Sequence, residues 1–64
     1  MNKKIMKMLD DAETMGQWGV DQIADIKARG AEHATQKTIE IARINLEGAV
    51  HWLNEILKER KAQP

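Results

Sequence analysis

The sequence predicts an all-α protein, an antiparallel helical hairpin with a short N-terminal helical arm that assembles into a symmetric helical homo-oligomer. Apolar residues recur at spacings of three and four along most of the 64 residues, and no stretch alternates as a strand does. A chain this short buries only about 60% of its unfolded surface. It contains no cysteine and therefore has no disulfide. Oligomerisation is the remaining expected source of stability.

The first element is predicted to be a short helical arm over about residues 2–15. Asn2 is a suitable N-cap, and a stripe of apolar and small residues starts at Ile5 with alternating spacings of four and three. The stripe includes Gly16 and Gly19, and each glycine costs about 1 kcal/mol in a helix interior. We therefore favour a break or kink at these two glycines. The alternative is one long helix that runs through them, in which the small residues permit a close crossing.

The second element is predicted to be a helix over about residues 20–33. Arg29 followed by Gly30 is typical of a helix C-terminus, because a cation is favourable in the last turn and glycine adopts the left-handed conformation that follows it. Residues 31–34 also favour a helix. The turn is therefore expected either at Gly30 or close to residues 35–37.

The third element, a helix over about residues 37–60, has the strongest pattern, and Thr35 or Thr38 can cap it. One stripe has the spacing of a seam for another helix: Ile39, Ala42, Leu46, Ala49, Leu53 and Ile56. Further apolar residues lie beside or opposite that stripe: Ile41, Ile44, Val50, Trp52 and Leu57. A helix that is apolar on more than one face is buried on more than one face. We expect an oligomer interface that includes Ile39, Leu46, Ala49, Trp52, Leu53 and Ile56.

Charge and hydropathy argue against two classes of partner. Lysine plus arginine equal aspartate plus glutamate at ten each, so no net positive charge is available to neutralise DNA phosphates. No apolar run approaches the roughly 18 residues of a membrane span. The basic start of the chain is followed by no signal-peptide pattern. We therefore expect a cytoplasmic protein that binds neither DNA nor a membrane.

The side chains that most enzymes use for nucleophilic catalysis are scarce. Serine, tyrosine and cysteine are absent. His51 follows Glu47 by one helical turn, which is more simply a surface ion pair than half of a metal site. We expect no enzyme, no cofactor and no metal.

A small set of residues can contact a ligand. Trp18 lies off the apolar stripe, beside Gly16 and Gly19, and an exposed indole there can stack on a nucleobase. The cations are most simply a solvated face, with phosphate contact as the alternative. The candidate ligand-binding residues are Trp18, Lys27, Arg29, His33 and Arg43.

The run from Ala42 to Trp52 resembles the signature helix of a phage helical-hairpin family. Members of this family are small sponges that sequester cyclic-nucleotide immune signals in the anti-CBASS and anti-Thoeris systems. The family pattern Leu-Glu-x-Ala-x-x-Trp is met here by Leu46, Glu47, Ala49 and Trp52. The first helix of the family resembles residues 22–34, so that the likeness covers about residues 20–57.

The resemblance implies a function without chemistry. Hairpins would assemble, and cyclic-nucleotide or ADP-ribose-derived signalling molecules would be sequestered between protomers without cleavage. If a phage encodes the chain, the host cytoplasm is where it would act. Two alternatives stay open, a small helical inhibitor or adaptor that binds a host protein, and a Rop-like four-helix dimer that binds RNA.

Overall fold

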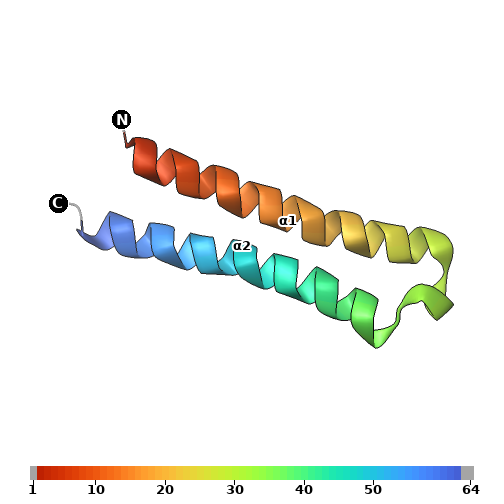
Figure 1. Ribbon diagram of the computed structural model, residues 1–64. Helices are drawn as coiled ribbons and strands as arrows, with labels where there is room; N and C mark the ends of the chain where they lie inside the picture. Colours follow the sequence, from red (N-terminus) through yellow and green to blue (C-terminus); the bar gives the residue numbers. More distant parts are fainter. Residues whose placement is uncertain (1, 63–64) are drawn as a thin grey trace.

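The computed structural model describes residues 2–62 as two long antiparallel helices (Figure 1). Helix α1 (Lys3–Arg29) and helix α2 (Gln36–Ala62) have 27 residues each, and the short 3-10 helix η1 (Ala31–His33) lies between them. The described residues contain no strand. The predicted all-α hairpin is therefore confirmed, whereas its assembly into an oligomer stays a prediction. The start of α1 and the end of α2 lie at the same end of the molecule (Figure 1).

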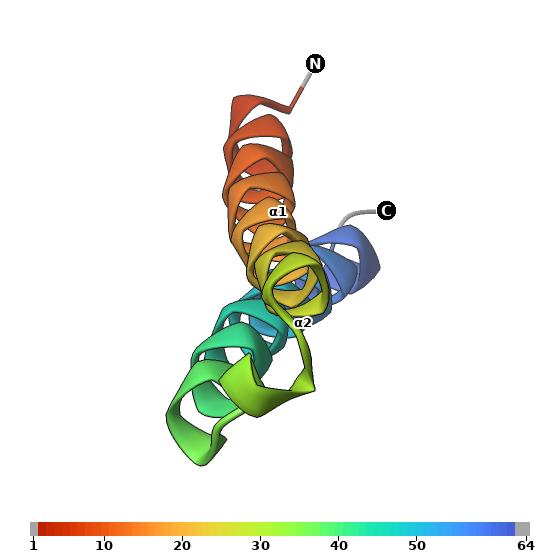
Figure 2. The same cartoon turned by 90° about the vertical axis from the view of Figure 1, so that its right-hand side faces the viewer.

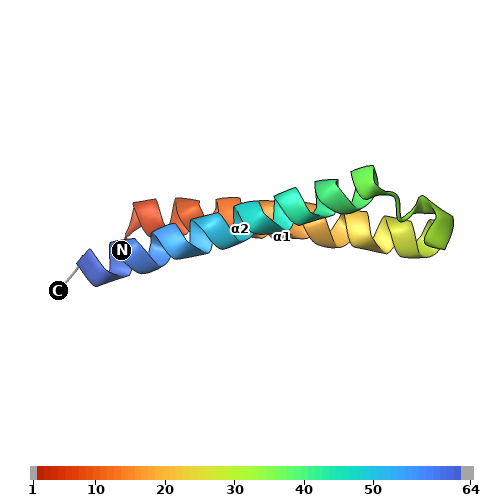
Figure 3. The same ribbon diagram turned by 90° about the horizontal axis from the view of Figure 1, so that it is seen from below.

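Helix α1 runs without interruption through both of its internal glycines, so the favoured break, with a separate arm over about 2–15, is wrong. The physical reason is tertiary contact: Gly19 is buried, and a Cβ built on Gly16 would lie 3.7 Å from the Cβ of Ala49. The glycines thus lie against α2, and the two helices cross each other at an angle (Figures 2 and 3). Close packing of the two backbones offsets the low helix propensity of glycine. Asn2 caps the helix, because its Oδ1 accepts a hydrogen bond of 3.1 Å from the Ile5 N–H.

The turn begins at Gly30, one of the two positions expected from the sequence. Gly30 has a φ of 112°, in the region that favours glycine, and its N–H donates to the Ile26 carbonyl at 3.0 Å. Helix α1 therefore ends at Arg29 and does not reach residue 33 as an α-helix, since residues 31–33 form η1.

Two threonines close the turn at the start of α2. The Thr35 N–H donates to the Thr38 Oγ1 at 3.0 Å, and the Thr38 N–H donates to the Thr35 Oγ1 at 3.2 Å. The Thr38 hydroxyl also donates to the His33 carbonyl at 2.7 Å. These bonds satisfy N–H groups that the first turn of a helix leaves unpaired. The predicted cap is confirmed, and the helix expected over about 37–60 is found at Gln36–Ala62.

The core between the helices is narrow. Its buried hydrophobic residues are Met8, Ala12 and Ala42. On α1 the buried and half-buried positions recur at spacings of three and four: Ile5, Met8, Ala12, Met15, Gly19, Gln22 and Ile26. On α2 the buried and half-buried positions include Thr38, Ala42, Asn45, Leu46, Ala49, Trp52, Ile56 and Glu59. Both helices thus present small or polar residues at several inward positions.

The seam that α2 presents to α1 is rotated relative to the stripe expected from the sequence. Ala42, Leu46, Ala49 and Ile56 are buried or half-buried as expected, but Ile39 and Leu53 are about half exposed, at 50% and 46%. The reason is steric. Small residues permit the close approach at the crossing, so the side chains of Ile39 and Leu53 lie at the margin of the contact.

Candidate functional site

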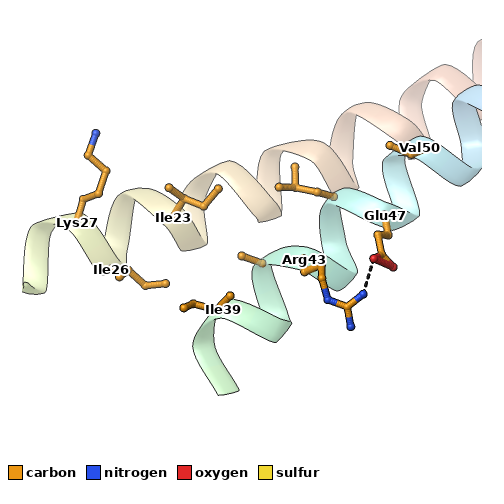
Figure 4. A pocket seen from close by; sticks show the side chains of 9 residues that line it. Ile23, Ile26, Lys27, Ile39, Arg43, Glu47 and Val50 are labelled. Carbon is orange, nitrogen blue, oxygen red and sulfur yellow. Dashed lines mark hydrogen bonds and ion pairs between the residues drawn. The ribbon is translucent and has the colours of Figure 1, made fainter. Parts of the chain in front are cut away.

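A groove of about 550 Å³ runs between α1 and α2 in the half of the hairpin nearest the turn. Its apolar lining residues are Ile23, Ile26, Ile39, Ala42, Leu46 and Val50. Lys27, Arg43 and Glu47 lie at its edge. In Figure 4, Ile26 reaches toward Ile39, and Arg43 lies beside Glu47. The groove is therefore an apolar surface with charged groups at the margin.

The groove continues as an apolar surface toward the free ends of the helices. Residues seven apart on a helix share a face, so Leu53 follows Leu46, and Leu57 follows Val50. Both Leu53 and Leu57 are exposed, at 46% and 59%. We call this surface the open apolar face, and its residues are Ile23, Ile39, Leu46, Val50, Leu53 and Leu57.

Arg43 is held by two carboxylates at the edge of the groove. Its Nη2 donates to the Glu40 Oε2 at 2.8 Å, and its Nη1 donates to Glu47. These hydrogen bonds raise the pKa of Arg43, and the bond from Arg43 lowers the pKa of Glu40. All three side chains are about half exposed, so solvent screens the pairs. Arg43 is a positioned cation, and its charge is already balanced by neighbours.

The structure brings only two of the five candidate ligand residues together. Lys27 and Arg43 line the same groove, and the Lys27 side chain extends away from α2 (Figure 4). Arg29 lies at the end of α1, where its Nε is 3.1 Å from the Asp25 Oδ1. His33 lies in η1, with its Nε2 4.0 Å from the Glu32 Oε1.

Trp18 lies apart from the groove. It is 55% exposed and borders a separate hollow formed by α1 residues, which include Glu13, Gln17 and Asp21. The surroundings of its indole are thus acidic and polar. The structure separates the one exposed indole of the described chain from the two cations of the groove.

The expected interface residues divide into two groups. Ile39 and Leu53 are exposed on the open apolar face, whereas Leu46 lines the groove of that face but is half-buried against Gly19. Ala49, Trp52 and Ile56 are half-buried and share the register of the intrachain seam. The Trp52 ring also packs edge-on against His51, with ring centroids 5.3 Å apart.

Sequence reasoning missed the role of two residues of the groove. Ile23 is 41% exposed and lines the groove from the side of α1. Val50 was placed only beside the seam. The signal was present in the sequence, because each lies one position beyond the seam on its helix, next to other aliphatic residues.

Other kinds of site are not found among residues 2–62. No cluster of three or more His, Cys, Asp or Glu side chains could hold a metal ion in that range. Within the same range, neither helix combines the length and the apolar character needed to cross a membrane.

No protein-family model, curated protein or solved structure matches this chain.

Proposed function

We propose that this hairpin acts by binding without catalysis, and sequesters a small signalling nucleotide, cyclic or ADP-ribose-derived, without cleaving it. The observation that supports the proposal is the groove between α1 and α2, which is apolar along its length and has Lys27 and Arg43 at its edge. Apolar surface suits the faces of the bases, and cations suit the phosphates. Such a sponge would act in the cytoplasm, that of the host if a phage encodes it.

Phosphate binding would use the two cations differently. Lys27 is a flexible point charge at the groove edge. Arg43 is already hydrogen-bonded to Glu40 and Glu47. Because exposed ion pairs contribute little, a phosphate can replace one carboxylate at small cost. Lys27 would therefore make the first contact with a phosphate of the ligand. Arg43 would then bind a phosphate in a fixed orientation.

The tightness required of a sponge implies that one hairpin is not enough. A nanomolar Kd corresponds to about −12 kcal/mol, and small-molecule sites of that quality bury most of the ligand. A groove open along one side leaves the ligand largely in solvent. The proposal therefore includes a homo-oligomer in which another protomer closes the groove.

The test is retention of nucleotide with recovery of the intact molecule. The protein is incubated with a panel of cyclic di- and trinucleotides and ADP-ribose derivatives, filtered, and denatured to release what it held. We expect depletion of one class from the filtrate and its intact release. Arg43→Ala is expected to abolish retention and to keep the assembly, while Lys7→Ala, a cation on α1 far from the groove, retains it. No depletion of any compound, or a degraded product, refutes the proposal.

A second candidate is an adaptor or inhibitor that binds a helix of another protein. The same groove favours it, because an apolar channel between two helices fits the apolar side of a third. This candidate requires a folded hairpin that remains monomeric in isolation. The oligomeric state of the free protein therefore distinguishes the two candidate functions, because the sponge requires an oligomer and the adaptor a monomer.

A further inference from the structure

One face of α1 combines an exposed indole with exposed carboxylates, and it points away from the groove. Trp18 is 55% exposed and borders a hollow of about 330 Å³, whose other lining residues are Glu13, Thr14, Gln17 and Asp21. Asp21 and the groove residue Ile23 are two positions apart, so their side chains leave the helix about 160° apart. Asp10 precedes Asp21 by about three helical turns and therefore shares its side of α1. We call this surface the Trp18 face, and its residues are Asp10, Glu13, Thr14, Gln17, Trp18 and Asp21.

The charge around the Trp18 face is of one sign. Between residues 8 and 26 the chain has five acidic residues and no lysine or arginine, although the whole chain has no net charge. Lys7 pairs with Asp11, and Arg29 pairs with Asp25, so two of these acids are balanced by cations that lie outside the stretch. The acids of the stretch that form no ion pair within residues 2–62 are Asp10, Glu13 and Asp21. All three belong to the Trp18 face, which therefore presents negative charge to solvent.

The two tryptophans of the chain have different surroundings. Trp52 is half-buried in the register of the intrachain seam, whereas more than half of Trp18 is open to solvent. The face of an indole attracts a cation more strongly than the other aromatic side chains do. Where carboxylates lie beside the indole, this attraction and direct charge pairing act on the same ligand. The Trp18 face therefore suits a cationic ligand.

We propose that the Trp18 face binds an arginine-containing basic segment of another protein. A guanidinium is planar, so it stacks on the Trp18 indole while its N–H groups donate to a carboxylate beside the ring. Asp21 follows Trp18 by three residues and is therefore its neighbour on the helix surface. The Gln17 Nε2 donates to the Asp21 Oδ1 at 2.8 Å, which orients this carboxylate, and its second oxygen can accept from the guanidinium.

A second cation of the same segment pairs with Glu13 and Asp10. These two carboxylates are three residues apart and are therefore neighbours on α1. Glu13 and Asp21 are eight residues apart, which is about 12 Å along the helix axis. An extended chain covers about 3.3–3.6 Å per residue, so cations about four positions apart reach both places. Because exposed ion pairs contribute little individually, binding requires the indole and both groups of carboxylates together.

The test uses short synthetic peptides in which two arginines lie about four positions apart among glycines, with matched lysine and citrulline peptides. Fluorescence anisotropy of the labelled peptides measures their affinity for the full chain. We expect the arginine peptide to bind most tightly, the lysine peptide less tightly and the neutral citrulline peptide least. Binding should weaken as the salt concentration is raised. The Trp18 indole N–H resonance, assigned by its loss in Trp18→Phe, should shift as the arginine peptide is added.

Substitutions on the Trp18 face test the indole and the carboxylates separately. Trp18→Ala is expected to weaken binding of the arginine peptide at least about fivefold, because it removes the stacking surface. It should preserve the helix, since Trp18 is exposed and alanine has a high helix propensity, and circular dichroism checks this. Asp21→Asn should also weaken binding. Glu32→Gln is its matched control, because it removes the same charge from a side chain that is 76% exposed and lies in η1.

Several outcomes would overturn the inference. One is equal binding of the arginine and citrulline peptides, or binding of neither. Another is equal weakening by Asp21→Asn and Glu32→Gln, because the attraction would then come from the overall charge. An unchanged Trp18 resonance places the binding elsewhere. Self-association that depends on Trp18, without peptide binding, gives the face to a second copy of the chain.

The inference goes beyond the proposed nucleotide site, and the two can fail separately. Asp21→Asn is expected to retain nucleotide as the wild type does, because Asp21 lies on the side of α1 away from the groove. A chain that binds the arginine peptide and retains no nucleotide refutes only the sponge. A chain that retains nucleotide and does not bind the peptide refutes only the basic partner.

Discussion

The side chain of Leu46 packs directly against the backbone of Gly19 where the two helices cross. A Cβ built on Gly19 would lie 2.5 Å from the Leu46 Cγ and 3.3 Å from the Ala42 carbonyl oxygen. Gly16, three residues earlier, has ordinary space, because its nearest contact would be the Ala49 Cβ at 3.7 Å. The two glycines of one helix therefore have different steric environments, although the sequence alone makes them equivalent.

Alanine at these two positions is expected to have opposite effects on stability. Gly19→Ala forces Leu46 from its place and is expected to lower the free energy of unfolding by about 1 kcal/mol, because overpacking outweighs the gain in helix propensity. Gly16→Ala is expected to raise it by about 0.5–1 kcal/mol. Urea unfolding at one fixed protein concentration measures both. The same sign for both variants would contradict the close contact at Gly19.

Gly30 is expected to tolerate a D-amino acid better than an L-amino acid. Its φ of 112° and ψ of 164° lie in a region that is essentially restricted to glycine. Gly30→Ala should therefore destabilise the hairpin by about 1–3 kcal/mol. A chain this short can be made by chemical synthesis, and D-alanine at position 30 is the control, since a D-residue favours positive φ. Equal losses of stability with both residues would show that the turn has another conformation.

Trp52 is expected to stabilise the oligomer indirectly, because it stabilises the fold of each hairpin. It is half-buried and shares the register of Ala42 and Ala49, which face α1. Trp52→Ala leaves a gap at the seam and is expected to cost about 2–3 kcal/mol, less than for a fully buried tryptophan, and to dissociate the oligomer. Unfolding and particle mass are measured together. An unchanged mass would mean that Trp52 does not support the assembly.

The acid stability of the hairpin is expected to depend on Glu40. The hydrogen bond from Arg43, and secondarily its charge, lowers the pKa of Glu40 below its ordinary value of 4.5. A carboxyl whose pKa is lower in the folded state stabilises that state above the ordinary pKa, and this contribution is lost as the pH falls through the lowered value. The Tm should therefore fall as the solution is acidified below pH 4.5.

Substitution identifies the group responsible for that acid response. Glu40→Gln is expected to lower the Tm at neutral pH and to flatten part of its acid dependence. Glu55 contributes in the same direction, because Lys58 lowers its pKa. Glu13→Gln, which removes an exposed carboxylate from the other helix, is the control for the loss of one charge. A Glu40→Gln profile identical to that of the wild type would mean that the Arg43 pair does not persist in solution.

The features of the fold that could be predicted from the sequence are those that depend on residues close together in the chain. The cap at Asn2 and the threonine cap of α2 depend on neighbouring residues, and both are confirmed. The end of α1 at Arg29 was one of two alternatives for the turn, and the helix does not reach residue 33. The continuity of α1 through Gly16 and Gly19 was the less favoured of two alternatives, because helix propensity is a local quantity whereas the compensating contacts come from α2.

The orientation of α2 was less predictable for a similar reason. Hydropathy favours Ile39 and Leu53 as inward residues over Thr38 and Asn45, but close packing selects the narrower stripe. For the candidate site, Lys27 and Arg43 were found from the sequence as separate cations. That they share one groove depends on the register of the two helices, which the sequence leaves open.

The ion pairs of the hairpin have a consequence for the order in which it folds. Each of the pairs made by Lys7, Arg29, Arg43 and Lys58 lies within one helix, α1 or α2. In contrast, the Lys4 Nζ lies 3.1 Å from the Glu59 Oε2 and joins the two helices. Contacts between residues close in sequence form first, since they close the shortest loops. Contacts between the two helices should therefore form first near Gly30 and then progressively toward the free ends, and the Lys4–Glu59 pair should form last. It should also be the first to open, so fraying should begin at that end.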